Sequence, residues 1–314
     1  MPLTLWEETQ SLQVLNIGSN LLRGTIPPSI GLVGATLRYL DVRENKLEGT
    51  LPTEIGLLTH LETVFLNGNS RLGGTVPTEF GHLTSLQLAE FGLNRFEGSL
   101  PSEISNCRSL SSIGFHSNDL SSTVSQTLEA LPANVAFVYF AFNNLTGPIP
   151  ATLSAHTHLT HLNLRSNGVS GSIPSEVGQT TTLTQLDLFS NQLTGALPTE
   201  LGLLGGLQLL NLANNMLVST LPSELGALTQ LTALDVADNS LTGSPGGAFA
   251  PISSLQYVAL QGNDWTDIES VCGVIPDGAD VSGNSCEEPN RFPCSCCTFC
   301  CTSPPYVELS CPFL

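Results

Sequence analysis

Apolar residues along this 314-residue chain follow one frame that returns every 24 or 25 residues. The frame first reads Leu12-x-x-Leu15-x-Ile17-x-x-Asn20-x-Leu22. Its period-2 alternation predicts a short strand that turns the leucines inward and leaves the x positions facing out. Eleven copies begin at Leu12, Leu37, Leu61, Leu86, Leu110, Val135, Leu159, Leu183, Leu207, Leu231 and Leu255.

An asparagine follows the predicted strand in every copy, where the chain begins to turn. A side-chain amide at this point can satisfy backbone polar groups that the turn would otherwise bury without partners. We therefore expect a structural ladder, with no binding role, made of Asn20, Asn45, Asn69, Asn94, Asn118, Asn143, Asn167, Asn191, Asn215, Asn239 and Asn263.

No single repeat can fold alone, because ordering about 24 residues costs as much free energy as its few buried side chains return. Stacking the repeats buries both flanks of each one. The sequence thus predicts an α/β, β-rich solenoid with a parallel concave sheet of about eleven strands.

The second half of each repeat reads Leu-x-Gly-x-Ile/Leu-Pro-Ser/Thr-Glu-hydrophobe-Gly, as in residues 193–202. Residues 1 to about 265 closely resemble the plant-type leucine-rich repeat, which implies a right-handed coil, a second short sheet and a short convex helix. Proline and glutamate both suit the start of such a helix. We interpret one glutamate column as favouring helix starts and not as a calcium ladder: Glu54, Glu79, Glu103, Glu176, Glu200 and Glu224.

Three repeats depart from this pattern. The fifth loses both glycine and proline in Ser122-Thr123-Val124-Ser125, the tenth shifts its proline to Pro245, and one residue is inserted after Asn69. We expect local distortions of the convex side and no break in the concave sheet.

Both ends differ from the repeats and divide the chain into three regions. Residues 1–11 are expected to be a partial N-terminal repeat without its cap, residues 12–265 the solenoid, and residues 266–314 a cysteine-rich cap or tail. Members of the family normally begin with a signal peptide and a cap that bears cysteine and tryptophan. Neither is present here, so we expect that the sequence is truncated at its start.

Eight of the nine cysteines fall within the last 43 residues. A disulfide-stapled cap is the favoured interpretation, with metal thiolate binding and lipidation as alternatives. Similar cysteine-dense tails occur on some algal leucine-rich-repeat proteins. The remaining cysteine, Cys107, is expected to be a buried apolar residue. The disulfide candidates are Cys272, Cys286, Cys294, Cys296, Cys297, Cys300, Cys301 and Cys311.

The charge balance excludes one class of partner. The chain has 27 acidic and 9 basic residues, a formal charge of −18, and nucleic-acid binding needs the opposite balance. No apolar run reaches the ~20 residues of a transmembrane helix. Catalytic signatures such as a Gly-x-Ser-x-Gly elbow are missing, so we expect a non-enzyme without cofactor or bound metal. The oligomeric state is not indicated.

Candidate binding residues gather at the outward positions of repeats five to eight. Exposed aromatic side chains beside an arginine and a carboxylate are typical of recognition surfaces. The predicted concave patch consists of His116, Phe137, Tyr139, His161, Arg165, Asp187 and Phe189.

Two further motifs received separate interpretations. His156, His158 and His161 lie close in sequence, but only His161 falls on the strand, so we favour a solvated loop over a zinc site. Asn144-Leu145-Thr146 is the one N-glycosylation sequon.

The leading hypothesis is an extracellular or cell-surface recognition protein, similar to plant receptor-like ectodomains, that binds a protein, peptide or glycan on its concave face. A soluble inhibitor of wall-degrading hydrolases is an alternative, and an intracellular scaffold with a metal-binding cysteine tail is another.

The stapled tail makes a direct prediction about thiols. If the eight cysteines of the tail are paired and Cys107 is buried, the folded, non-reduced protein should have almost no thiol that reacts with a thiol reagent. Titration with a chromogenic disulfide before and after unfolding measures this. About six or more reactive thiols in the folded protein would rule out the stapled extracellular cap.

Overall fold

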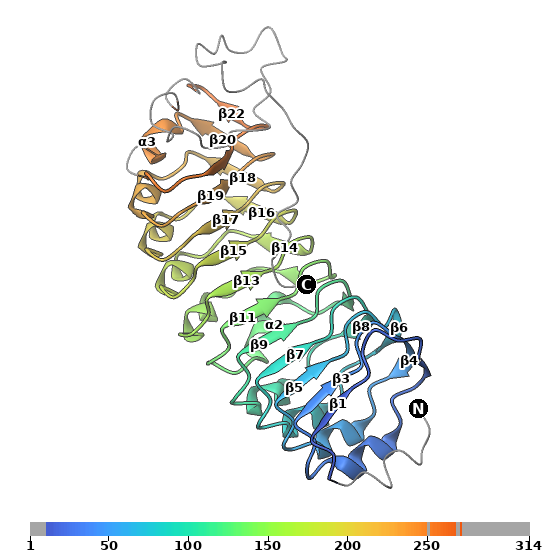
Figure 1. Ribbon diagram of the computed structural model, residues 1–314. Helices are drawn as coiled ribbons and strands as arrows, with labels where there is room; N and C mark the ends of the chain where they lie inside the picture. Colours follow the sequence, from blue (N-terminus) through green and yellow to red (C-terminus); the bar gives the residue numbers. More distant parts are fainter. Residues whose placement is uncertain (1–10, 250–251, 268–270, 272–314) are drawn as a thin grey trace.

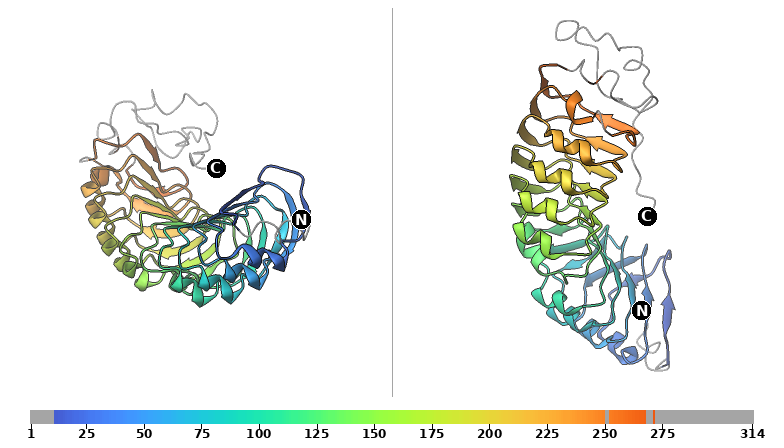
Figure 2. Two further views of the ribbon diagram at one scale, coloured as in Figure 1. Left: turned by 60° about the horizontal axis from the view of Figure 1, so that its bottom comes forward. Right: turned by 90° about the vertical axis from the view of Figure 1, so that its left-hand side faces the viewer.

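The computed structural model describes residues 11–249, 252–267 and 271, which form a curved solenoid of stacked coils (Figure 1). Each full coil contains a concave strand, a second strand and a short helix, in that order along the chain. Figure 2 shows the helices along the outer rim of the arc and the strands inside it. This is the predicted right-handed leucine-rich-repeat solenoid.

The concave sheet contains eleven parallel strands in sequence order. Frame positions stay in phase, so that Leu15 pairs with Leu40 and Leu186 with Leu210. The predicted sheet is confirmed, and it continues through the irregular fifth repeat. Its strands are β1 (Val14–Asn16), β3 (Tyr39–Asp41), β5 (Thr63–Phe65), β7 (Leu88–Glu90), β9 (Ser112–Gly114), β11 (Phe137–Tyr139), β13 (His161–Asn163), β15 (Gln185–Asp187), β17 (Leu209–Asn211), β19 (Ala233–Asp235) and β21 (Tyr257–Ala259).

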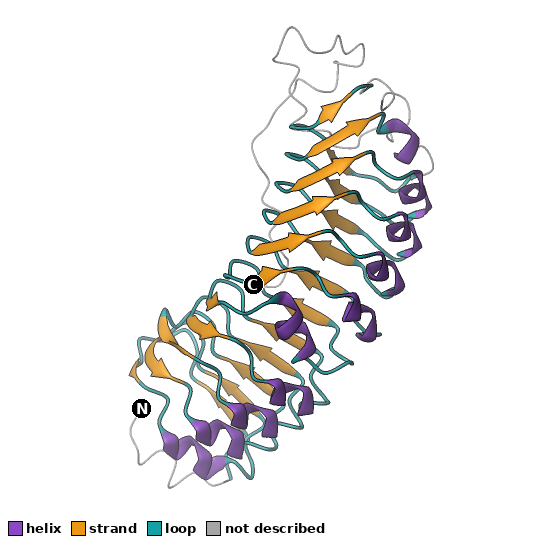
Figure 3. Ribbon diagram, turned by 180° about the vertical axis from the view of Figure 1, so that it is seen from behind, coloured by secondary structure: helices purple, strands orange, loops and turns teal. Residues whose placement is uncertain are grey.

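The second strands form two sheets, of five and six strands, on the neighbouring side of the coil (Figure 3). The first contains β2 (Arg23–Gly24), β4 (Lys46–Thr50), β6 (Arg71–Gly74), β8 (Arg95–Gly98) and β10 (Asp119–Leu120). The second contains β12 (Thr146–Gly147), β14 (Gly168–Gly171), β16 (Gln192–Gly195), β18 (Met216–Ser219), β20 (Ser240–Gly243) and β22 (Asp264–Trp265). Only an isolated bridge between Thr123 and Thr146 joins them, because the fifth repeat lacks the usual glycine and proline.

The convex side carries eight short 3-10 helices and two α-helices among the described residues. In each helix that contains a column glutamate, that residue lies in the first turn, directly after proline and a serine or threonine, as predicted. The helices are η1 (Pro28–Val33), η2 (Thr53–Leu57), η3 (Thr78–His82), η4 (Ser102–Asn106), α2 (Val124–Glu129), η5 (Ala151–Ala155), η6 (Ser175–Gln179), η7 (Thr199–Leu203), η8 (Ser223–Ala227) and α3 (Gly246–Phe249).

The departures from the repeat pattern change the convex side, as expected. In the fifth repeat Thr123 and Gln126 form a reciprocal capping box, and an α-helix replaces the 3-10 turn. The tenth repeat, with its shifted Pro245, forms α3. Neither change interrupts the register of the concave strands.

The asparagines form the predicted ladder. The Asn69 side chain is fully buried, and its Nδ2 donates to the carbonyl oxygens of Leu66 in its own turn (2.8 Å) and Val42 in the preceding coil (3.1 Å). Its Oδ1 accepts a hydrogen bond from the backbone amide of Leu47 (3.0 Å). One side chain therefore satisfies polar groups in two successive coils.

The core is a continuous column of buried aliphatic side chains with five phenylalanines in its middle. Phe91 and Phe115 stack with ring centroids 4.7 Å apart, and Phe80, Phe96 and Phe140 meet them edge to face. Such aromatic pairs contribute about 0.5–1.5 kcal/mol each beyond burial. They reinforce the stack where the fifth repeat loses its regular outer turn.

The ends of the chain leave several expectations untested. The partial repeat at residues 1–11 and the cysteine-rich region at 266–314, with its eight disulfide candidates, fall almost wholly outside the described residues. Cys107 lies in the core as a free thiol, as expected. Within the described part of the chain, no helix has the length and apolarity needed to cross a bilayer.

The ladder can be tested by removing one amide. Asn69→Ala should lower the free energy of unfolding by about 3 kcal/mol, because it leaves buried carbonyl and amide groups without partners. Asn20→Ala is the matched control, since the Asn20 side chain is exposed and its hydrogen bonds to the described residues stay within its own turn. Urea denaturation of both variants measures the difference, and equal destabilisation would contradict the role assigned to the ladder.

Candidate binding surface on the concave face

The concave sheet presents three outward positions per repeat, two on the strand and one just after it. Because the parallel strands stay in phase, side chains at one position form a column across the sheet. The sequence-predicted residues follow this plan. His116 follows β9, Phe137 and Tyr139 lie on β11, His161 and Arg165 lie on and after β13, and Asp187 and Phe189 lie on and after β15.

An aromatic cluster covers β11 and β13. The ring centroids of Phe137 and His161 are 4.8 Å apart, and Tyr139 lies 6.5 Å from Phe137 and 6.4 Å from His161. All three side chains are half-buried. Burial lowers the pKa of His161, so its ring is uncharged at neutral pH and packs as an aromatic group. The cluster is thus a preformed platform of three rings.

Arg165 lies beside this platform and contacts two more aromatic rings. Its guanidinium carbon is 4.3 Å from the ring centroid of Phe189 and 5.7 Å from that of Phe142. Its Nε is buried without a hydrogen-bond partner. The side chain is therefore held in place by cation–π contacts with two rings.

Asp187 has a structural role in addition to its place on the surface. Its Oδ1 accepts a hydrogen bond from the amide of Phe189, two residues ahead (3.1 Å). Asn163, Asn211 and Asp235 make the same bond on their own strands. Burial raises the pKa of Asp187 and raises that of Asp235 to about 6. The column at this position therefore fixes the turn that follows each of these strands.

His116 leans away from the aromatic platform. Gly92, just after β7, and Gly114, on β9, have no side chains, and polar neighbours fill the space. The His116 imidazole lies over Gly92 and the Glu90 carboxylate over Gly114, so a Cβ atom added at either glycine would overlap that group. The structure therefore places His116 toward β7 and does not join it to the ring cluster. Burial raises the pKa of Glu90 to about 7.

Sequence reasoning missed Phe142, which contacts Arg165. Phe142 has φ of 55° and an exposed ring, at a turn position that is left-handed in nearly every repeat. Most other residues in this column are serine, asparagine, aspartate or glycine, which tolerate such a backbone. A phenylalanine that breaks this pattern is the signal that could have identified it.

A second aromatic–arginine cluster lies on β3 and β5 and was also missed. The guanidinium carbon of Arg43 is 5.0 Å from the ring centroid of Phe65, and Tyr39 meets Phe65 edge to face at 5.9 Å. Arg43 Nε lies 3.3 Å from the buried carboxylate of Asp41. Tyr39, Asp41, Arg43 and Phe65 occupy the same outward columns from which the first cluster was predicted. They come from only two repeats, however, whereas four repeats contribute to the first cluster.

The remaining sequence-predicted residues lie apart from this surface. His156 is buried and His158 is exposed outside the concave strands, so the three clustered histidines occupy three different environments. Among the described residues, no group of three potential metal ligands occurs. Asn144 is exposed at the turn that precedes β12.

Sequence profiles of the leucine-rich repeat match residues 11–32, 36–58, 155–173, 182–204 and 205–264. A comparison with curated protein sequences gives no match. The fold, the profile matches and the ladder together define the class: the chain is a leucine-rich-repeat protein.

Within that class the fold resembles plant receptor ectodomains. The crystal structure of a TDR receptor is 28% identical, with a TM-score of 0.78 over 89% of this chain and 49% of that one. The GASSHO1/SCHENGEN3 ectodomain from Arabidopsis thaliana is 27% identical, with a TM-score of 0.57 over 90% and 40% of the two chains. A plant ice-binding protein, 24% identical, shares the fold with a TM-score of 0.60 over 75% and 80%. The chain spans about half the length of these receptor ectodomains or less.

The raised pKa of Glu90 predicts a pH-dependent stability. The folded state holds the proton of the Glu90 carboxyl more tightly than the unfolded state does. Its contribution to the free energy of unfolding is therefore fully present below about pH 4.5 and is lost as pH rises through about 7. Glu90→Gln should therefore gain about 2 kcal/mol relative to wild type between about pH 4.5 and 8. Urea unfolding at both pH values measures this, with the exposed Glu97→Gln as control. Identical pH slopes for wild type and Glu90→Gln would show that the carboxyl is not buried.

Proposed function

We propose that this chain is a non-catalytic recognition module, of the receptor-ectodomain type, that binds a peptide, protein or glycan ligand on its concave face. The observation that carries the proposal is the continuous surface formed by the rings of Phe137, Tyr139 and His161 and by Arg165 against Phe189. These side chains have little part in the core, which the inward leucines fill. Their packing against one another on the outside is explained best by contact with a ligand.

The energetics of this surface suit binding. Aromatic and arginine side chains are the residues that most often dominate interface free energies. Here they are already held by their neighbours, so a ligand would immobilise few additional rotamers. Arg165 is only half-buried, and its guanidinium can pair with a carbonyl or carboxylate of a ligand.

Phe189 and Tyr257 pack against a small group of buried alanines, Ala213, Ala237 and Ala259. These contacts help to fix the position of the Phe189 ring, over which the Arg165 guanidinium lies.

The structural neighbours support a receptor-like role. One of them was solved as a receptor kinase ectodomain in complex with CASPARIAN STRIP INTEGRITY FACTOR 2. Because this chain spans 40% of that ectodomain, the identity of its ligand is not transferred. We also propose an extracellular or cell-surface location, which the same likeness supports and with which an acidic chain and an exposed sequon at Asn144 are compatible.

The proposal predicts a defined loss of binding. Peptides selected by the wild-type chain from a random 12-residue display library should bind Phe137→Ala and Arg165→Gln about tenfold or more weakly, because each change removes about 1.4 kcal/mol or more of contact free energy. Arg95→Gln, an equal loss of charge on the second sheet, is the matched control. Fluorescence titration measures each affinity.

The same experiment can refute the proposal. If the selected peptides bind Phe137→Ala, Arg165→Gln and wild type equally, the concave cluster is not the binding surface. If Arg95→Gln weakens binding as much as Arg165→Gln, the interaction depends on net charge alone. Circular dichroism of each variant verifies that the solenoid remains folded.

A further inference from the structure

A second surface, on the lateral edge of the solenoid, differs in charge from the rest of the chain. We define this edge as the segments that run from each convex helix to the next concave strand. Among the described residues of these segments, Glu62 is the only carboxylate, and it is ion-paired with Arg38. These connecting segments are therefore almost free of negative charge, although the formal charge of the chain is −18 and glutamates such as Glu79, Glu103 and Glu129 lie on the convex helices beside them.

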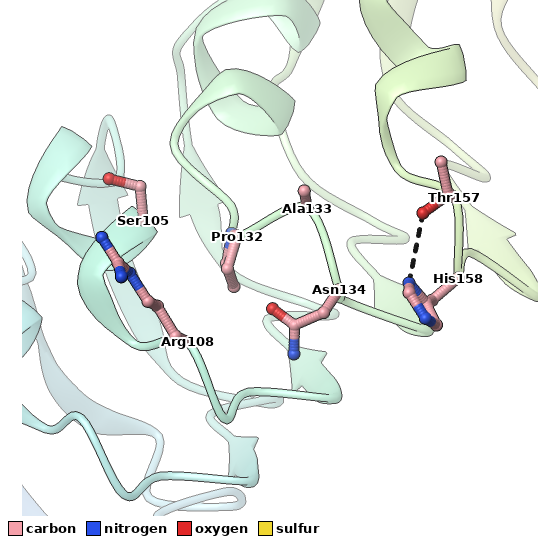
Figure 4. A pocket seen from close by; sticks show the side chains of 7 residues that line it. All are labelled: Ser105, Arg108, Pro132, Ala133, Asn134, Thr157 and His158. Carbon is pink, nitrogen blue, oxygen red and sulfur yellow. Dashed lines mark hydrogen bonds between the residues drawn. The ribbon is translucent and has the colours of Figure 1, made fainter.

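Two adjacent depressions lie on this edge and share Arg108. One is also lined by Ser105, Asn134, Thr157 and His158, from three successive coils (Figure 4). The other continues toward the N-terminal coils and is also lined by His82. Neither lining contains an aspartate or glutamate among the described residues. Arg108 is exposed and takes part in no ion pair of the described part of the chain.

The geometry points to a binding site for an anionic oligosaccharide in this double depression, with Arg108 at its centre. Arginine contacts carboxylate and sulfate through two parallel hydrogen bonds, and the flanking imidazoles of His82 and His158 offer further donors. Ser105 Oγ donates to the carbonyl oxygen of Ser102 and Asn134 Nδ2 to that of Leu110, so both side chains offer acceptor oxygens to the hydroxyl groups of a sugar. Thr157 Oγ1 is hydrogen-bonded to Nδ1 of His158.

The extent of the site favours an acidic oligosaccharide over a single small anion. The lining residues come from four successive coils, with His82 in the third, Arg108 in the fourth and His158 in the sixth. Donors at separate points along the edge suit a chain that carries acidic groups at intervals. An acidic peptide is a poorer fit, because Pro132 and Ala133 are the only apolar lining residues that could receive its side chains.

This site is independent of the concave surface. The acidic residues of the concave face, such as Asp41 and Asp235, lie on the strands and not on the lateral edge. A long-range attraction for an anion is therefore weak over the whole molecule and becomes favourable only close to Arg108. Binding should accordingly be local and sensitive to single substitutions.

The test uses the whole chain and a defined probe, tetragalacturonate, in calorimetric titrations at low ionic strength. Arg108→Gln should weaken its binding about tenfold or more, and His158→Gln should weaken it to a lesser degree. Arg95→Gln is the control for loss of one exposed positive charge, and Arg165→Gln tests independence from the concave surface. Both should bind the probe as wild type does. A sulfated tetrasaccharide in place of the uronate shows which acidic group is preferred within the same class.

Five outcomes would overturn the inference. The first three are no binding of either anionic tetrasaccharide, equal binding of neutral maltotetraose, and equal weakening by Arg95→Gln. The fourth is tighter binding of a tetraglutamate peptide than of the uronate, which would assign the edge to acidic peptides. The fifth is loss of binding in Arg165→Gln, which would place the probe on the concave face.

Discussion

The structure depends on one hydrogen-bonding constraint. The buried backbone N–H and C=O groups in the turn of each coil need hydrogen-bond partners, and the next coil supplies them. The ladder asparagines meet it by donating to carbonyl oxygens in their own turn and the preceding one, and by accepting an amide from the preceding second strand. The residue before each ladder asparagine has a left-handed backbone in every coil, which gives the asparagine side chain the same orientation in each turn. Adjacent coils are thereby locked in phase, and every outward side chain acquires a fixed neighbour on either side.

Function can be separated from folding for the same reason. Inward leucines and the phenylalanine stack supply the core, so outward positions can vary without loss of the fold. Where rings and an arginine occupy these positions on β11, β13 and β15, they form a surface of interlocking contacts. Where glycine occupies them, as at Gly92 and Gly114, neighbouring polar side chains fill the space and their charge is suppressed by burial. The lateral edge is formed by other residues of the same coils, and Arg108 is exposed on it.

Most of the fold could be predicted from the sequence because its determinants are periodic. Leu15, Asn20 and their counterparts specify the strand, the turn and the sheet, and the departures at Thr123 and Pro245 correctly marked the irregular convex helices. The split of the second sheet was not foreseen, since it depends on how far the backbones of the fifth and sixth repeats pair, and an isolated bridge between Thr123 and Thr146 takes the place of a ladder there. The site was predicted only in part. Columns identify which side chains face outward, but they do not reveal that His116 leans toward Gly92 or that Phe142 reaches Arg165.

The central claim is that ligands meet the concave face at the ring cluster. Hydroxyl-radical footprinting with mass spectrometry, in the presence and absence of a selected peptide, measures the solvent access of individual side chains. Phe137, Tyr139, His161 and Phe189 should become protected by the peptide, whereas exposed Met216 on the second sheet should react as before. Protection that is confined to the second sheet or to the convex helices, with the four rings unchanged, would contradict the account.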